Sequence, residues 1–443
     1  METGRMPVRK HLNTDALLDC CRKEFGKIAD HRSGGVEILL PDALIAGVAL
    51  FQMKDPSLLA FQKRGADDNF RFVHGITRLP SDTQMREILD EVDPESLRPA
   101  FTAIFGQLQR GKVLETMRYL DEGLLLALDG VEYFCSDNVH CSKCMQRQRR
   151  GHAEPEYYHQ MLGAVIVHPE KKQVLALMPE PIQQQDGTKK NDCERNAGIR
   201  FLQKFRGDHP HLEVVVVEDG LGSNGPHIRQ LKACDCHFIL GAKDGDHASL
   251  QKQLDAACER GAAHTHTVTD PETNLCHRFV WATGLYLNDS NRDLLVNYLR
   301  YQQEAPDGKS REFTWVTDLE LRPNNVYRIM RAGRARWKIE NETFNTLKNQ
   351  GYHFGHNFGH GQNHLSVIFS LLMMLAFLID QVQELTNHVF QKAMSVAGCK
   401  RTLWENLRSL WASYRVTSMR QLHEALAHGF KKPNLQPKLN NSS

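Results

Sequence analysis

Three acidic residues, Asp129, Asp219 and Glu340, have the sequence setting of metal ligands. Asp129 directly follows the apolar run 124–128, and Asp219 follows a second, largely apolar run at 212–217. Such runs are typical of strands that are buried on both faces at the centre of a sheet. A carboxylate at the end of such a strand lies at the edge where open α/β sheets bind ligands. Together with Glu340, which stands in a basic segment predicted to be helical, the two aspartates predict an all-oxygen site for Mg²⁺ or Mn²⁺.

Two metal ions in such a site can support in-line phosphoryl transfer, because one activates the attacking oxygen and the other stabilises the leaving oxygen. The alternative for either aspartate alone is an ordinary turn, since Asp-Gly after a strand is a common turn signal. Three carboxylates in this order favour the metal site.

Positive charge is concentrated in two segments, although the formal net charge of the chain is only +2. Such clusters are the usual electrostatic footprint of a phosphate-binding surface, and the alternative is a solvated charged face. The first cluster comprises Lys143, Arg147, Arg149 and Arg150, and the second comprises Arg331, Arg334, Arg336 and Lys338.

The second cluster surrounds Glu340 on the predicted helix. At about 100° per residue, Arg336, Glu340, Phe344 and Lys348 share one broad helical face. We therefore expect Arg336 and Lys348 to contact phosphates on either side of Glu340, Arg336 in a bidentate manner. The alternative is an exposed Arg–Glu pair of the kind that stabilises any helix surface.

The composition is that of an ordinary soluble protein, with 41% hydrophobic and 24% charged residues in 443. The N-terminal segment lacks the apolar core of a secretory signal. The 11 cysteines form no disulfide framework, which predicts reduced thiols and a cytoplasmic location. The apolar run 365–379 is short for a membrane span, so we expect a buried core helix and no membrane association.

The order of predicted elements indicates an α/β fold: a ribonuclease-H-like catalytic core interrupted by a β-rich insertion, with helical N- and C-terminal regions. The core order is three strands, a helix, a strand, a helix and a strand, and Asp129 and Asp219 end the first and fourth strands. The predicted strands lie near 124–129, 160–168, 172–179, 212–218 and 236–241, and the helices near 190–206 and 223–233.

These elements divide the chain into five parts. Apolar residues at helical spacing predict a helical N-terminal domain, and β-prone segments among turns predict the insertion. The polar end of the chain, 431–443, is expected to be disordered. The parts are the helical N-terminal domain 1–120, the first part of the core 121–250, the β-rich insertion 251–322, the last part of the core with the Glu340 helix 323–380, and the helical C-terminal region with its tail 381–443.

Cys135, Cys141 and Cys144 suggest a structural zinc site, with His140, His152 and His159 nearby. The Cys141-x-x-Cys144 spacing is that of zinc knuckles. A second matched pair is missing from the sequence, so reduced cysteines in a hairpin after Asp129 are the alternative.

Four histidines, at 353, 356, 360 and 364, recur at helical intervals after Glu340. The glycines among them favour a turn-rich connector over a stable helix. We expect these histidines to make backbone or phosphate contacts rather than to bind a metal.

Three motifs, at 127–130, 217–221 and 336–348, resemble those of the DDE transposases of bacterial insertion sequences. The resemblance covers roughly residues 120–380 and is closest to the branch with a β insertion between the second aspartate and the glutamate. In one respect the chain departs from the wider group. Gly333 stands at the position of a tyrosine, and Lys348 lies one residue later than the lysine of the pattern.

The resemblance implies metal-dependent cleavage of DNA ends and strand transfer, with Mg²⁺ or Mn²⁺ as the cofactor. It implies two ions, with Asp129 bridging both and Asp219 and Glu340 each completing one. The expected partners are double-stranded DNA, with terminal inverted repeats and target DNA, and a second copy of the chain in a synaptic homodimer. The expected location is the bacterial cytoplasm, in association with the nucleoid.

Some members of the group stack a flipped base on a tryptophan of the insertion, and Trp281 and Trp315 are the candidates here. The alternative for each tryptophan is a place in the core. Two other functions stay open: a catalytically silent, transposase-derived DNA-binding protein, and a nuclease of the same fold that does not transpose.

Overall fold

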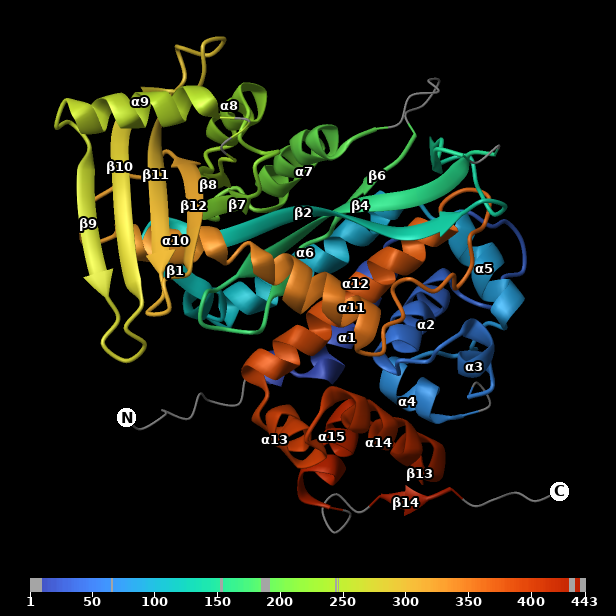
Figure 1. Ribbon diagram of the computed structural model, residues 1–443. Coiled ribbons are helices and arrows are strands. Elements are labelled where there is room, and N and C mark those ends of the chain that lie inside the picture. The colour runs from blue at the N-terminus through green and yellow to red at the C-terminus, as the bar shows by residue number, and fades with distance from the viewer. Residues whose placement is uncertain are drawn as a thin grey trace.

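A mixed β-sheet of twelve strands runs across the molecule (Figure 1). The computed structural model describes residues 10–64, 67–151, 154–184, 192–243, 245, 247–429 and 435–438. Along the sheet the strand order is β3-β4-β2-β7-β8-β12-β11-β10-β9, and β1, β5 and β6 pair with single neighbours beside this path.

The middle of the sheet has the strand order predicted for the core. β2 pairs antiparallel with β4 on one side and parallel with β7 on the other, and β7 pairs parallel with β8. The apolar runs 124–128 and 214–217 are buried in it, as their composition predicts. The bounds are β1 Arg118–Leu120, β2 Gly123–Ser136, β3 Met145–Arg147, β4 Glu156–Val167, β5 Leu175–Ala176, β6 Glu180–Ile182, β7 Val214–Glu218 and β8 His237–Gly241.

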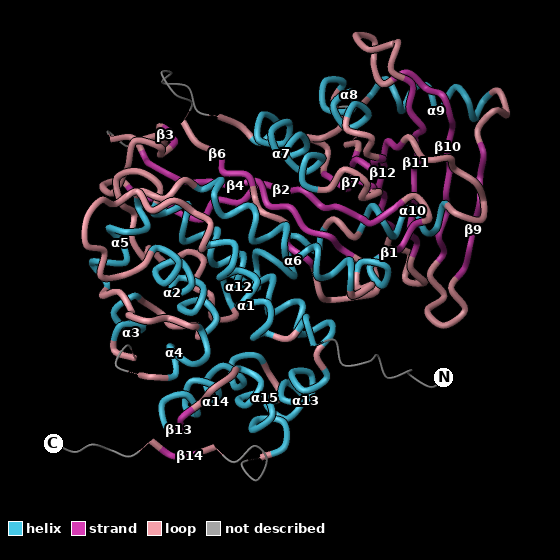
Figure 2. The backbone as a smooth tube through the Cα atoms, turned by 180° about the vertical axis from the view of Figure 1, so that it is seen from behind, coloured by secondary structure: helices cyan, strands magenta, loops and turns pink. Residues whose placement is uncertain are grey.

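The third predicted strand, 172–179, is the least accurate of these predictions. The segment contributes only β5, of two residues, and the chain then forms β6 on the same neighbour, β4. The expected helices are present as α7 Glu194–Asp208 and α8 Gly225–Ala233. They cover one face of the sheet, and α10 Val326–Arg334 and α12 Leu365–Thr386 lie on the other (Figures 1 and 2).

The insertion extends the core sheet instead of forming a separate layer. Its last strand pairs antiparallel with β8, with Val316 opposite Leu240. A helix begins the insertion, and its Gln253 donates a hydrogen bond to the carbonyl of Tyr286 at 2.9 Å. The bounds are α9 Ala248–Glu259, β9 His264–Thr269, β10 Cys276–Tyr286, β11 Leu295–Glu304 and β12 Ser310–Thr317.

The N- and C-terminal helices pack together around α12 (Figure 1). The N-terminal helices are α1 Thr14–Phe25, α2 Leu40–Gln52, α3 Leu58–Gln62, α4 Asn69–His74, α5 Asp82–Asp90 and α6 Arg98–Arg110, with 3₁₀ turns at Lys10–Leu12, Pro94–Leu97 and Leu114–Met117. The C-terminal elements are α13 His388–Ala397, α14 Lys400–Ser413, β13 Tyr414–Arg415, α15 Met419–His428 and β14 Gln436–Pro437. β13 and β14 pair, so part of the tail expected to be disordered forms a strand, and apart from 435–438 the tail lies outside the described residues.

The long apolar helix α12 is a core helix. By length and composition it could cross a membrane, but 94% of its most apolar window is buried inside the protein. Near its C-terminal end, Asp380 pairs with Lys54 at 2.6 Å and accepts a hydrogen bond from the hydroxyl of Tyr352, also at 2.6 Å. A buried charge is retained where it is paired and hydrogen-bonded, as it is here.

Candidate active site

The parallel pairing of β2 and β7 places Asp129 and Asp219 beside each other. Ala127 is opposite Val217, so two residues further along each strand the two aspartates occupy equivalent positions. β7 ends at Glu218, whereas β2 continues to Ser136 with β4 as its partner. Asp129 therefore lies inside a strand rather than at its end, and the early end of β7 opens the sheet beside it.

Arg336 joins Glu340 to Asp129. Its Nη1 lies 2.9 Å from Oε1 of Glu340 and 3.3 Å from Oδ2 of Asp129. The arginine side chain is only 11% exposed, whereas the side chains of Asp129 and Glu340 are 23% and 37% exposed. The structure thus brings together two of the predicted carboxylates and the predicted arginine. Asp129 is 207 positions from Arg336 in the chain, and Glu340 is four positions from it.

Glu340 lies in a π-helical segment, Ile339–Phe344, and not in a continuous α-helix. π turns are rare and occur frequently at functional sites. The segment is held on the sheet by Phe344, because a Cβ at Gly163 would lie 2.7 Å from its ring. Gly163 is the β4 residue directly opposite Asp129, so this close approach sets Glu340 over Asp129.

Negative charge is crowded around Asp129. Burial raises the pKa of Asp129 to about 7, and the nearby charges of Glu340, Glu194 and Asp219 add to this rise while Arg336 opposes it. Asp219 is partly held by its own loop, because its Oδ1 accepts a hydrogen bond from the backbone N–H of Leu221 at 2.9 Å. Such a set of carboxylate oxygens fits a hard divalent cation, whose charge would favour the ionised form of Asp129.

Glu194 is a fourth carboxylate at this site that sequence reasoning did not assign. It is the first residue of α7, and its Oε1 accepts a hydrogen bond from Gln160 at 2.7 Å. A Cβ at Gly130 would lie 2.1 Å from that same oxygen, so the glycine after Asp129 makes room for Glu194. The sequence does show acidic residues at the start of a predicted helix, in the segment 192–194. This segment agrees with the family resemblance, but the sequence alone does not indicate a role for Glu194.

Of the two predicted tryptophans, Trp315 lies beside the carboxylates and Trp281 does not. Trp315 lines a cavity of about 410 Å³ that also includes Asp219 and Arg336. A Cβ at Gly333 would lie 2.6 Å from the indole nitrogen of Trp315, so the indole fills the space beside Gly333. Trp281 is 1% exposed and stacks on His264, so it offers no face to a base in this structure.

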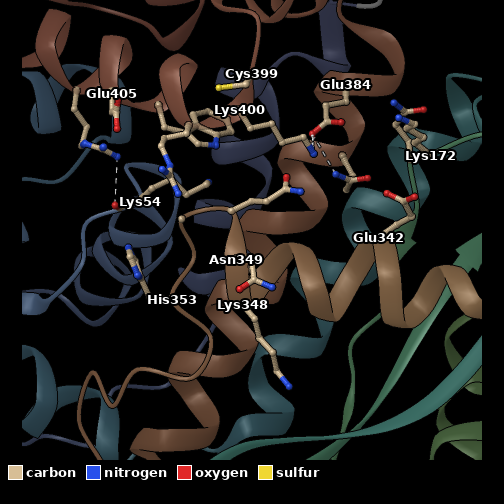
Figure 3. A pocket seen from close by; sticks show the side chains of 17 residues that line it. Lys54, Lys172, Glu342, Lys348, Asn349, His353, Glu384, Cys399, Lys400 and Glu405 are labelled. Atoms are coloured by element: carbon tan, nitrogen blue, oxygen red, sulfur yellow. Dashed lines mark hydrogen bonds and ion pairs between the residues drawn. The ribbon is translucent and has the colours of Figure 1, made fainter.

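Lys348 does not lie on the same side as Arg336 and Glu340, which a continuous α-helix would predict. It lines a different cavity, of about 630 Å³, together with Lys400 and Glu384, and its side chain points away from both (Figure 3). Within the described part of the chain Lys348 forms no ion pair. A π turn is wider than an α turn, so residues on its two sides no longer share one face.

Several arginines of the two basic clusters pair with carboxylates of the chain. In the first cluster, Arg147 pairs with Glu132 at 2.6 Å and also with Glu156, which Arg149 contacts as well. In the second, Arg331 pairs with Glu170 at 3.0 Å. Phosphate binding by the two clusters stays a prediction.

A compact group of sulfur and nitrogen atoms lies further along β4. It consists of Cys141, Cys144, His159 and His360, whose ligand atoms all lie within 4.8 Å of one another, and all four residues are buried. His360 is one of the four histidines that we did not expect to lie at a metal-type site, and the fold, not the sequence spacing, brings it there.

The other residues predicted for a zinc site lie outside this group. Cys135 is exposed, and its sulfur is 3.8 Å from a nitrogen of Arg147. His140 stacks on Tyr157 with ring centroids 4.3 Å apart. His152 lies outside the described residues. The prediction was wrong for Cys135 because β2 extends to Ser136 as a regular strand, which holds Cys135 away from the turn that carries Cys141 and Cys144.

Comparison with known proteins shows the family of the chain. No curated protein matches the chain. Among solved structures, it is similar to a piggyBac transposase in a synaptic complex with hairpin DNA, with 11% identity and a TM-score of 0.39 over 95% of this chain and 84% of that one. The family profile described as "Transposase DDE domain" matches residues 132–378, a range that includes Asp219 and Glu340 and begins three residues after Asp129. Because this match spans more than half of the chain, the protein belongs to the transposase DDE domain family.

Proposed function

We propose that this protein is an active transposase that cleaves DNA at the ends of a mobile element and joins those ends to target DNA. The observation that carries the proposal is the convergence of Asp129 and Glu340 on Arg336, with Asp219 on the adjacent parallel strand. Family membership supports phosphoryl transfer on DNA as the reaction class.

The donor set supports Mg²⁺ or Mn²⁺ as the cofactor. Asp129, Asp219 and Glu340 supply only carboxylate oxygens, the ligand type that these hard cations prefer. These three residues would hold the two ions. When bound, such ions supply activation of the attacking oxygen and stabilisation of the leaving 3′ oxygen.

The residues around the carboxylates have positioning roles. Arg336 holds Asp129 and Glu340 in one place, and its remaining guanidinium nitrogens are available to a phosphate. Gln160 and Gly130 fix Glu194 at the rim of the site. At that position Glu194 adds to the negative charge around Asp129. This charge attracts a proton as well as a cation, so Asp129 is favoured in its ionised form only when a divalent cation is bound.

Two groups are proposed to contact DNA beside the scissile phosphate. Trp315 lines the cavity next to Asp219, but it is only 5% exposed and stacks on Phe313, so an unpaired base would meet only the part of the indole that borders the cavity. Trp337 is 49% exposed, lines the same cavity and carries the guanidinium of Arg336 over its ring at 4.7 Å. Lys348, which is exposed, is proposed to contact the DNA backbone further from the carboxylates.

We further propose a bacterial insertion sequence as the source of the chain, acting in the cytoplasm on nucleoid DNA. Its DNA partners would be the terminal inverted repeats of that element and a target duplex. Since two ends must be brought together before joining, the acting form would be a homodimer.

The experiment is a cleavage assay on DNA fragments that carry the sequences flanking the gene. Wild type is compared with Asp129→Ala, Asp219→Ala and Glu340→Ala, each with Mg²⁺, with Mn²⁺ and with a chelator. We expect metal-dependent nicking at the element end by wild type only, with DNA binding retained in all four proteins. A matched control is Asp289→Ala, at an exposed residue paired with Arg292 in the insertion.

The other two functions predict different results in the same assay. A silent DNA-binding protein would bind the ends without nicking them under any metal. A nuclease that does not transpose would cut unrelated DNA as well as the flanking sequences and would produce no joined products. Nicking that survives Glu340→Ala would show that a different residue is the third carboxylate.

A further inference from the structure

We propose that Cys141, Cys144, His159 and His360 bind one structural Zn²⁺ that fastens the segment after Glu340 to the sheet. This site is separate from the carboxylates and takes no part in phosphoryl transfer. The inference does not depend on the proposed function, because it concerns metal content and folding.

Four of the six distances between the ligand atoms are close to those of a tetrahedral zinc site, and the other two are within 4.8 Å. With Zn–S near 2.3 Å and Zn–N near 2.05 Å, a tetrahedron has edges of about 3.8 Å between two sulfurs and about 3.6 Å between sulfur and nitrogen. The sulfurs of Cys141 and Cys144 are 3.8 Å apart. Nε2 of His159 is 3.4 Å from each sulfur, and Nε2 of His360 is 3.2 Å from the sulfur of Cys144.

The surroundings also favour a cation over a cluster of neutral groups. Nδ1 of His159 and Nδ1 of His360 are buried and have no hydrogen-bond partner within the described residues, so the polar contacts of each ring are made through Nε2, which faces the sulfurs, while Phe134 packs against both rings. The backbone N–H of Cys141 lies 3.4 Å from the sulfur of Cys144, a contact that stabilises a thiolate. Burial of four such groups is far less costly when they share a metal ion.

A disulfide between the two cysteines does not explain the arrangement. Their sulfurs are 3.8 Å apart, well beyond the bond length of about 2.05 Å. A disulfide would also leave both imidazoles facing a group that neither donates nor accepts strongly. The combination of two soft sulfurs and two imidazoles selects zinc over the hard cations of the carboxylate site. Because all four positions are filled by the protein, the site is of the closed, structural type.

The four ligands come from three segments that are far apart in the chain. Cys141 and Cys144 stand in the turn after β2, His159 lies in β4, and His360 lies in the connection between the Glu340 segment and α12. His159 is four residues before Gly163 on β4, so the zinc site lies about 13 Å along the sheet from the level of Asp129. That separation keeps it out of the reaction and within the same rigid sheet.

The connection that carries His360 is also held by other contacts, and Phe358 in its middle packs on Phe51 of α2 with ring centroids 5.1 Å apart. At the α12 end, Asp90 accepts hydrogen bonds from the backbone N–H groups of residues 362–365 at 2.8 to 3.0 Å. At the other end, Phe354 packs on Tyr133 with ring centroids 5.7 Å apart. A zinc ion at His360 would fix the middle of this connection to β4 and to the turn after β2. The position of the Glu340 segment would then be restrained from both sides.

The test is the metal content of the full-length protein, purified without chelators or immobilised metal columns. We expect one zinc per chain by elemental analysis, and X-ray absorption at the zinc edge should show two sulfur and two nitrogen neighbours. Cys144→Ser and His360→Ala should each reduce zinc to less than about a tenth of an equivalent. The matched controls Cys135→Ser and His356→Ala should retain it.

Measurements on the wild-type protein test the zinc site even if a ligand variant fails to fold. Wild-type protein treated with a chelator should lose its zinc, melt at a lower temperature and recover when zinc is added back. Zinc bound only by oxygen, or lost in Asp129→Ala but retained in His360→Ala, would assign the ion to the carboxylates and overturn the proposal. Folded wild-type protein that contains no zinc, and takes up neither Zn²⁺ nor Co²⁺ at the thiols, would also overturn it.

Discussion

Nη1 of Arg336 lies 3.3 Å from Oδ2 of Asp129, although the two residues are 207 positions apart. The same nitrogen contacts Glu340, so a single guanidinium connects the central strand to the π-helical segment. Without its charge, the carboxylates would face one another in a poorly solvated site. The geometry of the proposed metal site therefore depends on a residue that binds no metal.

Replacing Arg336 by lysine should impair cleavage strongly. Both contacts come from Nη1 of a planar guanidinium that lies over the ring of Trp337 at 4.7 Å, a placement that a flexible, strongly hydrated ammonium group does not reproduce. We expect the single-turnover rate of end cleavage to fall by roughly 10²- to 10³-fold, the scale seen when one oriented donor is lost from an active site. The control is Arg331→Lys, at an arginine that pairs with Glu170 on the surface. Equal rates for the two variants would contradict a special role for Arg336.

The stability of the metal-free protein should decrease as pH rises through the range set by Asp129. The pKa of this carboxyl is raised from 3.8 to about 7 in the folded chain, so the folded state binds the proton more tightly than the unfolded state. Its contribution to stability is full below pH 3.8 and is lost as pH approaches about 7. Asp129→Asn should therefore be more stable than wild type at pH 7.5, by about 0.5–2 kcal/mol, and should show no such gain near pH 4.

Urea unfolding in the presence of a chelator measures this difference. Asp289→Asn, at an exposed aspartate of the insertion, serves as the control and should change stability little at either pH. A gain in stability for Asp129→Asn that is the same at both pH values would show that the proton of Asp129 is not its cause. At subsaturating Mg²⁺, cleavage by the wild type should rise with pH, because the cation competes with the proton of Asp129.

Glu194→Gln should change the metal requirement more than the maximal rate. The side chain is fixed by Gln160 and contributes negative charge near Asp129 without touching Arg336. We expect the Mg²⁺ concentration for half-maximal cleavage to increase roughly 10-fold or more, as for residues that support metal ligands. Glu170→Gln is the surface control. A lower maximal rate at saturating Mg²⁺ would instead place Glu194 in direct contact with the reaction.

Asp380→Asn should destabilise the helical part of the molecule. Asp380 pairs with Lys54 inside the core, and both side chains are almost fully buried. Removing one partner leaves the other charge buried and unpaired, which costs about 3–5 kcal/mol. The exposed pair of Asp307 and Lys309 supplies the control, because Asp307→Asn should cost less than about 1 kcal/mol. Denaturant unfolding of both variants is the measurement.

Gly163→Ala should displace the Glu340 segment. The added Cβ would lie 2.7 Å from the ring of Phe344, and overpacking of this kind costs about 1–3 kcal/mol. We expect lower stability together with slower cleavage, and recovery of both in a double variant with Phe344→Leu. Gly207→Ala, in α7 where a Cβ meets nothing within 4 Å, should be neutral or slightly stabilising. Cleavage that is unchanged in Gly163→Ala would show that this contact does not position Glu340.

The sequence determined the core of the fold because its signals are local. The apolar runs before Asp129 and Asp219 indicate buried strands wherever they occur, and the order of strands and helices then restricts the topology to few choices. The close spacing of Arg336 and Glu340 likewise indicates a contact on one turn of helix. Each of these features depends only on residues near to one another in the chain.

Only the tertiary structure decided which distant residues meet. The π turn after Arg336 separates Lys348 from Glu340, and β12 joins the insertion to the core sheet and brings Trp315, but not Trp281, beside Asp219. Glu194 and His360 reach their sites because close packing and strand pairing bring separate segments together. Contacts of this kind cannot be predicted from a local sequence pattern. The aspartates could be recognised from their own strands, whereas the fourth carboxylate and the fourth ligand of the cysteine–histidine group depend on the register of the whole sheet.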